Sequence, residues 1–159
     1  MAFKINIPSV VGIISAVLAM FSVTLVWFTA SSAKGFFIGT GTQITGWEIF
    51  SAVGSGAFSS AFIVPLAVVG FGFSLLALSL LGCLSMYNQL DKRMLSIPMI
   101  VIGLLFIALY VFLYNDYTAQ AAEFGVTLTV EFGMYLVLLA GVGGIAAGAL
   151  RQMTQIREE

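Results

Sequence analysis

Four long apolar stretches separated by more polar segments dominate this chain. They run from about 10 to 29, 61 to 86, 94 to 114 and 132 to 150. A helix that crosses the hydrocarbon core of a bilayer needs about 20 mostly apolar residues, because the core is roughly 30 Å thick and each residue rises about 1.5 Å. The pattern therefore predicts a single membrane domain over residues 1–159, with four transmembrane helices.

The first stretch also fits a second interpretation, a cleaved signal peptide. Lys4 supplies a basic start, and Ser31-Ser32-Ala33 is similar to a small-residue cleavage site. However, the apolar part is longer than the roughly 7–15 residues of a signal-peptide core. We therefore favour a retained transmembrane helix over a signal peptide.

Composition and charge agree with a lipid environment. Hydrophobic residues make up 60% of the chain and charged residues only 8%, whereas soluble domains carry about 25% charged residues. With four spans, one side of the membrane holds all the basic residues except Lys34, namely Lys4, Lys92, Arg93, Arg151 and Arg157. The excess of basic residues predicts a multi-pass cell-membrane protein with both termini in the cytoplasm.

The residue inventory excludes several kinds of chemistry. The chain has no histidine and one cysteine, Cys83, which removes histidine-based acid–base catalysis, histidine-containing metal sites and an intrachain disulfide. Cys83 is either a small packing residue or a palmitoylation site. No basic stripe or nucleotide-binding motif is present, so nucleic acid is not an expected partner. We expect a non-enzymatic protein without catalytic residues, cofactors or metal ligands.

The two external segments, 30–60 and 115–131, contain strand-forming patterns. Residues 36–40 and 42–45 are β-prone, which predicts a hairpin with Gly41 near its turn. Residues 126–130 alternate between apolar and polar side chains, so they form either a third strand or the first turns of the fourth helix. The predicted fold class is an all-α membrane protein, a four-helix transmembrane bundle with a small extracellular antiparallel β-sheet or hairpin.

Four external or span-end residues are candidates for contact or anchoring. Trp27 closes the first span, where amphipathic rings anchor helix ends at the headgroup level. Trp47 is interpreted as a buried plug or an interface anchor, with contact to a partner as the alternative. Glu48 and Glu131 are acidic residues on the external side, as are Asp116 and Glu123.

Small residues mark candidate sites of close helix packing. Ala140, Gly144 and Gly148 are spaced four apart and share one helix face. Without bulky side chains there, a neighbouring helix can approach closely, and that neighbour belongs either to the same chain or to another subunit. In the second span, Gly70 and Gly72 allow a kink or a tight crossing.

The layout resembles that of the claudin-like tetraspan proteins. The shared features are four spans, cytoplasmic tails, Trp27 at the end of the first span and a long β-prone first external segment. The segment from Phe132 to Leu136, running into Gly143-Gly144, is similar to the last helix of small prokaryotic four-span proteins. The claudin signature of Gly-Leu-Trp followed by a cysteine pair is not matched at Gly46-Trp47. The resemblance therefore implies an architecture and does not imply a paracellular barrier.

Two functional hypotheses follow. The first is a small membrane protein that acts by lateral assembly, as a structural or accessory subunit of a homo- or hetero-oligomeric complex, with membrane lipids and other membrane subunits as partners. The alternative is an oligomeric channel or pore-forming subunit. In that case the external acidic residues would form a vestibule that attracts cations.

Overall fold

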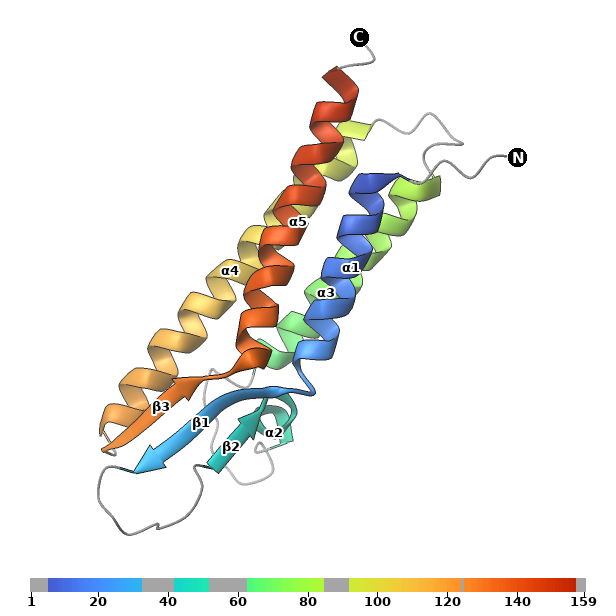
Figure 1. The fold of residues 1–159 in the computed structure, drawn as a ribbon. Helices are drawn as coiled ribbons and strands as arrows, with labels where there is room; N and C mark the ends of the chain where they lie inside the picture. Colours follow the sequence, from blue (N-terminus) through green and yellow to red (C-terminus); the bar gives the residue numbers. More distant parts are fainter. Residues whose placement is uncertain (1–5, 33–41, 52–62, 85–91, 124, 157–159) are drawn as a thin grey trace.

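The structure is a computed structural model that describes residues 6–32, 42–51, 63–84, 92–123 and 125–156. Figure 1 shows helices gathered side by side, with a small sheet at one end and both chain termini at the other. In chain order the elements are α1 (Ile7–Ser22), β1 (Val26–Ser32), β2 (Thr42–Thr45), α2 (Gly46–Ser51), α3 (Ile63–Leu84), α4 (Lys92–Glu123), β3 (Val126–Val130) and α5 (Phe132–Ile156).

Four helices form the bundle, and α1 and α4 each pack against both α3 and α5. The interior is filled by large buried side chains from several helices, including Leu75, Met99 and Phe106. Phe71 and Phe106 meet edge to face with their ring centroids 6.0 Å apart, an arrangement that aromatic pairs prefer. The centre of the bundle is therefore a packed apolar core.

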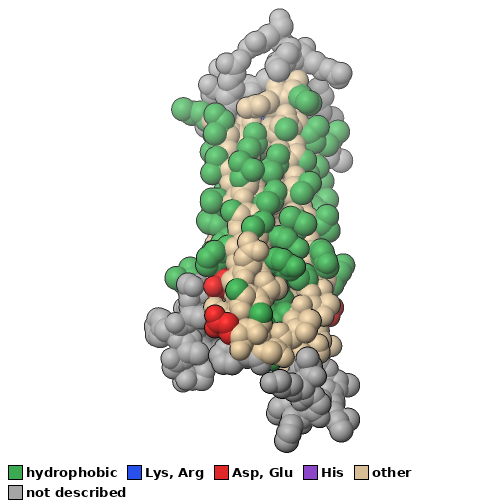
Figure 2. Space-filling model, turned by 90° about the vertical axis from the view of Figure 1, so that its left-hand side faces the viewer, with side chains coloured by type: hydrophobic (Ala, Val, Ile, Leu, Met, Phe, Trp, Pro, Cys, Tyr) green, Lys and Arg blue, Asp and Glu red, His purple; other side chains and the backbone are tan. Residues whose placement is uncertain are grey.

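Three of the described helices, α3, α4 and α5, are long and apolar enough to cross a membrane. They contain most of the predicted spans 61–86, 94–114 and 132–150. Figure 2 shows hydrophobic side chains along the outside of the bundle and acidic side chains near the end that carries the sheet. Large exposed hydrophobic residues, such as Phe73 and Leu104, are expected where a surface faces lipid. The chain is thus a membrane protein by the character of its helices.

The first predicted span, 10–29, is wrong at its outer end. α1 has 16 residues and ends at Ser22, which makes it about 24 Å long at 1.5 Å per residue. The hydroxyl groups of Ser22 and Thr24 donate to carbonyls three residues earlier, and such local bonds compete with the helix. Residues 26–29 then become part of β1, because Val, Trp, Phe and Thr favour a strand that packs on one face.

The three strands form an antiparallel sheet in the order β2-β1-β3. β3 pairs with β1 from Phe28 opposite Val130 to Ser32 opposite Val126, so the strand interpretation of residues 126–130 is confirmed. β2 pairs with β1 as well, with Ala30 opposite Thr42. Residues 42–45 thus form a strand, and their described partner is β1. Residues 36–40 and Gly41, the other parts of the expected hairpin, lie outside the described residues.

α4 continues beyond the predicted span and ends at Glu123, so part of the segment 115–131, expected as a connection, is helical. Its last turns contain the helix-forming residues Ala, Gln and Glu. Tyr117, in this extension, stacks on Phe28 of β1 with ring centroids 5.2 Å apart. The chain then turns at Gly125, whose φ of 67° lies in the left-handed region that glycine favours. The extension thus holds the sheet against the bundle.

Candidate functional site

Glycines of α4 and α5 bring the backbones of these two helices into close contact. A Cβ atom on Gly103 of α4 would lie 2.6 Å from the carbonyl oxygen of Gly141 and 2.7 Å from the backbone nitrogen of Ile145, both on α5. A Cβ atom on Gly144 would lie 3.2 Å from the Cα atom of Gly103. The two backbones touch at this crossing, as small residues allow in membrane helices.

The predicted ridge of Ala140, Gly144 and Gly148 is buried within the chain. At its inner end, a Cβ atom on Gly148 would lie 2.8 Å from the carbonyl oxygen of Ser96, a residue of α4. The Ser96 hydroxyl donates a 2.8 Å hydrogen bond to the Gly148 carbonyl oxygen. Gly144 and Gly148 therefore face α4 of the same chain.

The two candidate glycines of α3 have opposite environments. Gly72 is buried against α1, where its Cβ atom would lie 2.9 Å from Met20 Cγ. Gly70 is exposed, and a Cβ atom there would meet nothing within 4 Å. The exposed Ser74 hydroxyl donates to the Gly70 carbonyl oxygen at 2.9 Å. Gly70 is therefore a small position on the outside of the bundle that no part of the described chain covers.

Trp27 is completely buried. The sequence predicted an anchor at the headgroup level, where the ring would be exposed at the end of a span. Its indole Nε1 donates a 2.7 Å hydrogen bond to the Ser22 carbonyl oxygen. Cβ atoms on Gly46 and Gly133 would lie 2.7 Å and 2.5 Å from the indole ring. The turn after α1 leads into β1, and the Trp27 ring is buried between the starts of α2 and α5. Trp27 is therefore the buried plug that the sequence predicted at Trp47.

Trp47 itself lies on the surface of α2 with 61% of its side chain exposed. A buried plug at Trp47 is therefore wrong, and a surface contact with lipid or another molecule fits its position. α2 has only six residues, from Gly46 to Ser51. The indole is thus held outward at the sheet end of the bundle.

The external glutamates have local structural partners. Glu131 Oε1 accepts a 2.8 Å hydrogen bond from the hydroxyl of Thr29, which joins the start of α5 to β1. Glu48 Oε2 accepts from the backbone N–H of Thr45 at 2.8 Å, and the Glu48 N–H donates to the Thr45 hydroxyl at 3.1 Å. These reciprocal bonds are a capping box at the start of α2. Both carboxylates therefore stabilise the structure around the sheet.

At the opposite end of the bundle, Arg151 of α5 points inward and is only 3% exposed. Its Nη2 donates a 2.8 Å hydrogen bond to the hydroxyl of Ser9 on α1. Its Nη1 is buried and has no hydrogen-bond partner in the described part of the chain. A Cβ atom on Gly82 of α3 would overlap the guanidinium group, so this glycine makes room for it. Three helices thus surround one buried cation.

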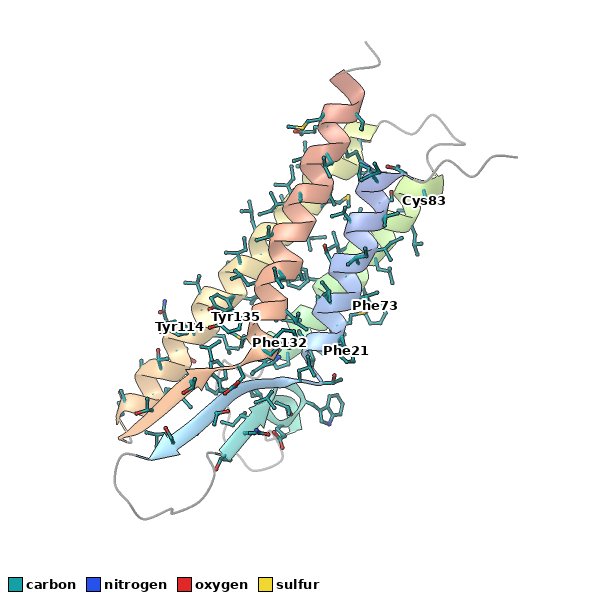
Figure 3. The ribbon with its side chains drawn as sticks, viewed as in Figure 1. Phe21, Phe73, Cys83, Tyr114, Phe132 and Tyr135 are labelled. Atoms are coloured by element: carbon teal, nitrogen blue, oxygen red, sulfur yellow. The ribbon has the colours of Figure 1, made fainter. Side chains whose placement is uncertain are left out.

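Sequence reasoning missed the buried position of Arg151 because it counted this residue among the basic residues of the cytoplasmic side. Its position four residues from Ala147 and seven from Gly144, on the ridge that faces the bundle, was the available signal. Cys83, next to Gly82, is half-buried at the same end (Figure 3). The buried end of α5 is therefore a candidate site that the charge pattern alone did not reveal.

No group of three or more His, Cys, Asp or Glu side chains that could hold a metal ion occurs among the described residues. The Arg151 guanidinium only donates hydrogen bonds, and the Ser9 hydroxyl beside it can also donate, so these groups suit an anion better than a metal cation.

No protein-family model matches the chain, and no curated protein shows significant similarity to it.

Proposed function

We propose that the chain is a non-enzymatic, four-span membrane protein that acts by lateral assembly, as a structural or accessory subunit of a homo- or hetero-oligomeric complex. Both termini lie in the cytoplasm, as the basic residues at that end favour. α1 completes the set of four spans, because it packs against two of the three longer apolar helices, α3 and α5. The proposed architecture is that of the claudin-like tetraspan proteins.

The observation that carries this proposal is the outward face of α3 around Gly70. Gly70, Ser74 and Ala77 are exposed small residues, and Gly70 has open space where a Cβ atom would be. The inward glycines on the bundle helices, such as Gly72, Gly103 and Gly144, all have close neighbours. Small residues in membrane helices mark close helix contacts, and no described part of the chain covers this face, which favours a neighbour from another chain.

Phe73 gives the same face a protruding group. Its ring is 59% exposed and points away from the bundle in Figure 3. A face that has both a recess, at Gly70, and a neighbouring protrusion can be complementary to itself across a two-fold axis. The simplest assembly is therefore a dimer of two α3 faces, in which the Phe73 ring of each copy covers the recess of the other.

Cysteine cross-linking in native membranes tests this assembly. In a Cys83→Ser background, Ala77→Cys places a thiol on the proposed face, and Ala108→Cys places one on the exposed surface of α4. We expect an oxidant to give disulfide-linked dimers with Ala77→Cys in clear excess over Ala108→Cys. The added change Gly70→Leu is expected to abolish that excess, because the leucine side chain fills the recess.

The proposal would be overturned if Ala77→Cys cross-linked no better than Ala108→Cys while the protein was monomeric by native mass spectrometry in a mild detergent. Gly70→Leu is not expected to prevent folding, because a Cβ atom at this exposed position meets nothing within 4 Å and leucine is the better helix former. Loss of the dimer in this variant would therefore reflect the interface.

A further inference from the structure

Among the described residues, Arg151 is the one charged residue whose side chain is buried. Burying a cation without a counter-charge costs several kcal/mol, so buried charges are normally paired. The guanidinium donates its described hydrogen bond to the neutral hydroxyl oxygen of Ser9, and no described carboxylate pairs with Arg151. The fold nevertheless accommodates the group, since Gly82 leaves the space that it occupies. A guanidinium buried in this way requires a negatively charged partner.

A second positive feature lies beside the guanidinium, at the start of α1. The N-cap residue Asn6 makes no side-chain capping bond, and the first turn contains no acidic residue. The Asn6 amide instead donates to the Gly82 carbonyl oxygen at 3.4 Å. The first helical bond is from Val10 N–H to Asn6 O, so the earlier N–H groups of Ile7 and Ser9 have no partner within the helix. Such an uncapped N-terminus attracts negative charge.

Ser9 joins the two features. Its oxygen accepts from Arg151 Nη2, which leaves its own proton available to donate. The unpartnered Arg151 Nη1, the Ser9 hydroxyl and the N–H groups of the first turn are all donors. A set of donors around a guanidinium is the arrangement that binds phosphate oxygens.

We propose that Arg151, Ser9 and the uncapped first turn of α1 form a binding site for a phosphate oxyanion. The depth of the site identifies the natural source. The apolar segment of α5 ends at Thr154, and α1 begins at Ile7. Arg151 therefore lies about one helical turn inside the end of this apolar segment, within reach of the headgroups of the adjoining leaflet. The ligand is the phosphate of an anionic phospholipid, and a soluble phosphate is the other source of the same chemistry.

Thermal unfolding of the purified full chain in mild detergent tests the site. The probes are phosphatidylglycerol, a galactosyl diacylglycerol with similar tails and no phosphate, and inorganic phosphate. We expect phosphatidylglycerol to raise the Tm of the wild type and the galactolipid to leave it unchanged. Native mass spectrometry then measures lipid retention. Arg151→Gln is expected to weaken phosphatidylglycerol binding by about tenfold or more, because hydrogen bonds to a charged group are lost.

Matched variants separate the site from general effects on the fold. Ser9→Ala removes the hydroxyl at the site, whereas Ser15→Ala removes a hydroxyl of the same helix that donates to Val11 O. Arg157→Gln removes the same charge as Arg151→Gln from the tail of the chain. We expect Ser9→Ala to reduce lipid binding and the two controls to leave it unchanged. Because Ser9→Ala retains the arginine, it keeps the test decisive if Arg151→Gln does not fold.

Two outcomes would overturn the proposal. One is equal stabilisation by the galactolipid, which would assign the effect to the acyl tails. The other is phosphatidylglycerol binding by Ser9→Ala that equals the binding by Ser15→Ala and by the wild type. Stabilisation by inorganic phosphate that is lost in Ser9→Ala would support the oxyanion site and assign it to a soluble ligand.

Discussion

Substitution of Gly103 by alanine measures how tightly α4 and α5 pack. The new Cβ atom would lie 2.6 Å from the carbonyl oxygen of Gly141, whereas ordinary contact begins at 3.4 Å. The backbones must therefore separate locally by about 0.8 Å, a gap that forfeits roughly a quarter to a half of each dispersion contact that it opens. Overpacking of this kind costs about 1–3 kcal/mol.

The same change on the outer surface supplies the control. Gly70→Ala has no neighbour within 4 Å, so it shows only the helix-propensity gain of about 0.5–1 kcal/mol that any mid-helix Gly→Ala change brings. Because this gain is common to both variants, their difference isolates the packing cost. We expect Gly103→Ala to be less stable than Gly70→Ala by about 1–3 kcal/mol.

Equilibrium unfolding in mixed micelles, with increasing sodium dodecyl sulfate and detection by circular dichroism, provides the free energies. The protein must be monomeric under these conditions, so that association through the α3 face does not contribute. A Gly103→Ala variant as stable as Gly70→Ala would refute the backbone contact between α4 and α5.

Two further predictions use the same preparation. Trp47→Phe leaves the buried Trp27 as the tryptophan fluorophore, and we expect its emission to resist quenching by acrylamide. Trp27→Phe leaves the exposed Trp47, and we expect acrylamide to quench its emission readily. Equal quenching of the two variants would contradict the buried position of Trp27. Ser96→Ala removes the hydrogen bond to the Gly148 carbonyl and should lower the free energy of unfolding by about 0.6 kcal/mol. Ser74→Ala, whose exposed hydroxyl bonds within its own helix, should have a smaller effect, and an equal loss would show that the Ser96 bond is not special.

The parts of the fold that depend on local pattern could be predicted from the sequence. Long uncharged stretches located α3, α4 and α5, because charge is excluded from such lengths of membrane helix. The alternation of residues 126–130 indicated β3, although the same residues also suited a helix. Pairing with β1 decides in favour of the strand, and pairing is a contact between distant parts of the chain.

The boundary between α1 and β1 could not be found from hydropathy. Residues 25–28, Leu-Val-Trp-Phe, continue the apolar run of α1 without interruption. A buried strand and a membrane helix look alike in such a run, because both need apolar side chains on every face. The β-branched and aromatic residues from Val26 onward were the available hint. The hydrogen bonds of Ser22 and Thr24, which end the helix, become visible only in the structure.

The candidate sites depended on which helix faces inward. Gly70 and Gly72 are two residues apart and look equivalent in sequence, but one is exposed and the other touches α1. Arg151 was counted correctly as a basic residue near a span end. That it turns inward depends on Gly82, which is far away in the chain, and no sequence pattern links the two residues.

The arrangement of α1 and α5 has a mechanical consequence. At one end their continuations, β1 and β3, are hydrogen-bonded to each other, and the Glu131 N–H donates to Trp27 O. At the other end Arg151 is bonded to Ser9. Sliding of α1 along α5 would have to break the hydrogen bonds at both ends together, so these two helices move as one rigid unit. A force applied to the sheet would therefore reach the Arg151 end of the bundle as a rigid displacement of both helices.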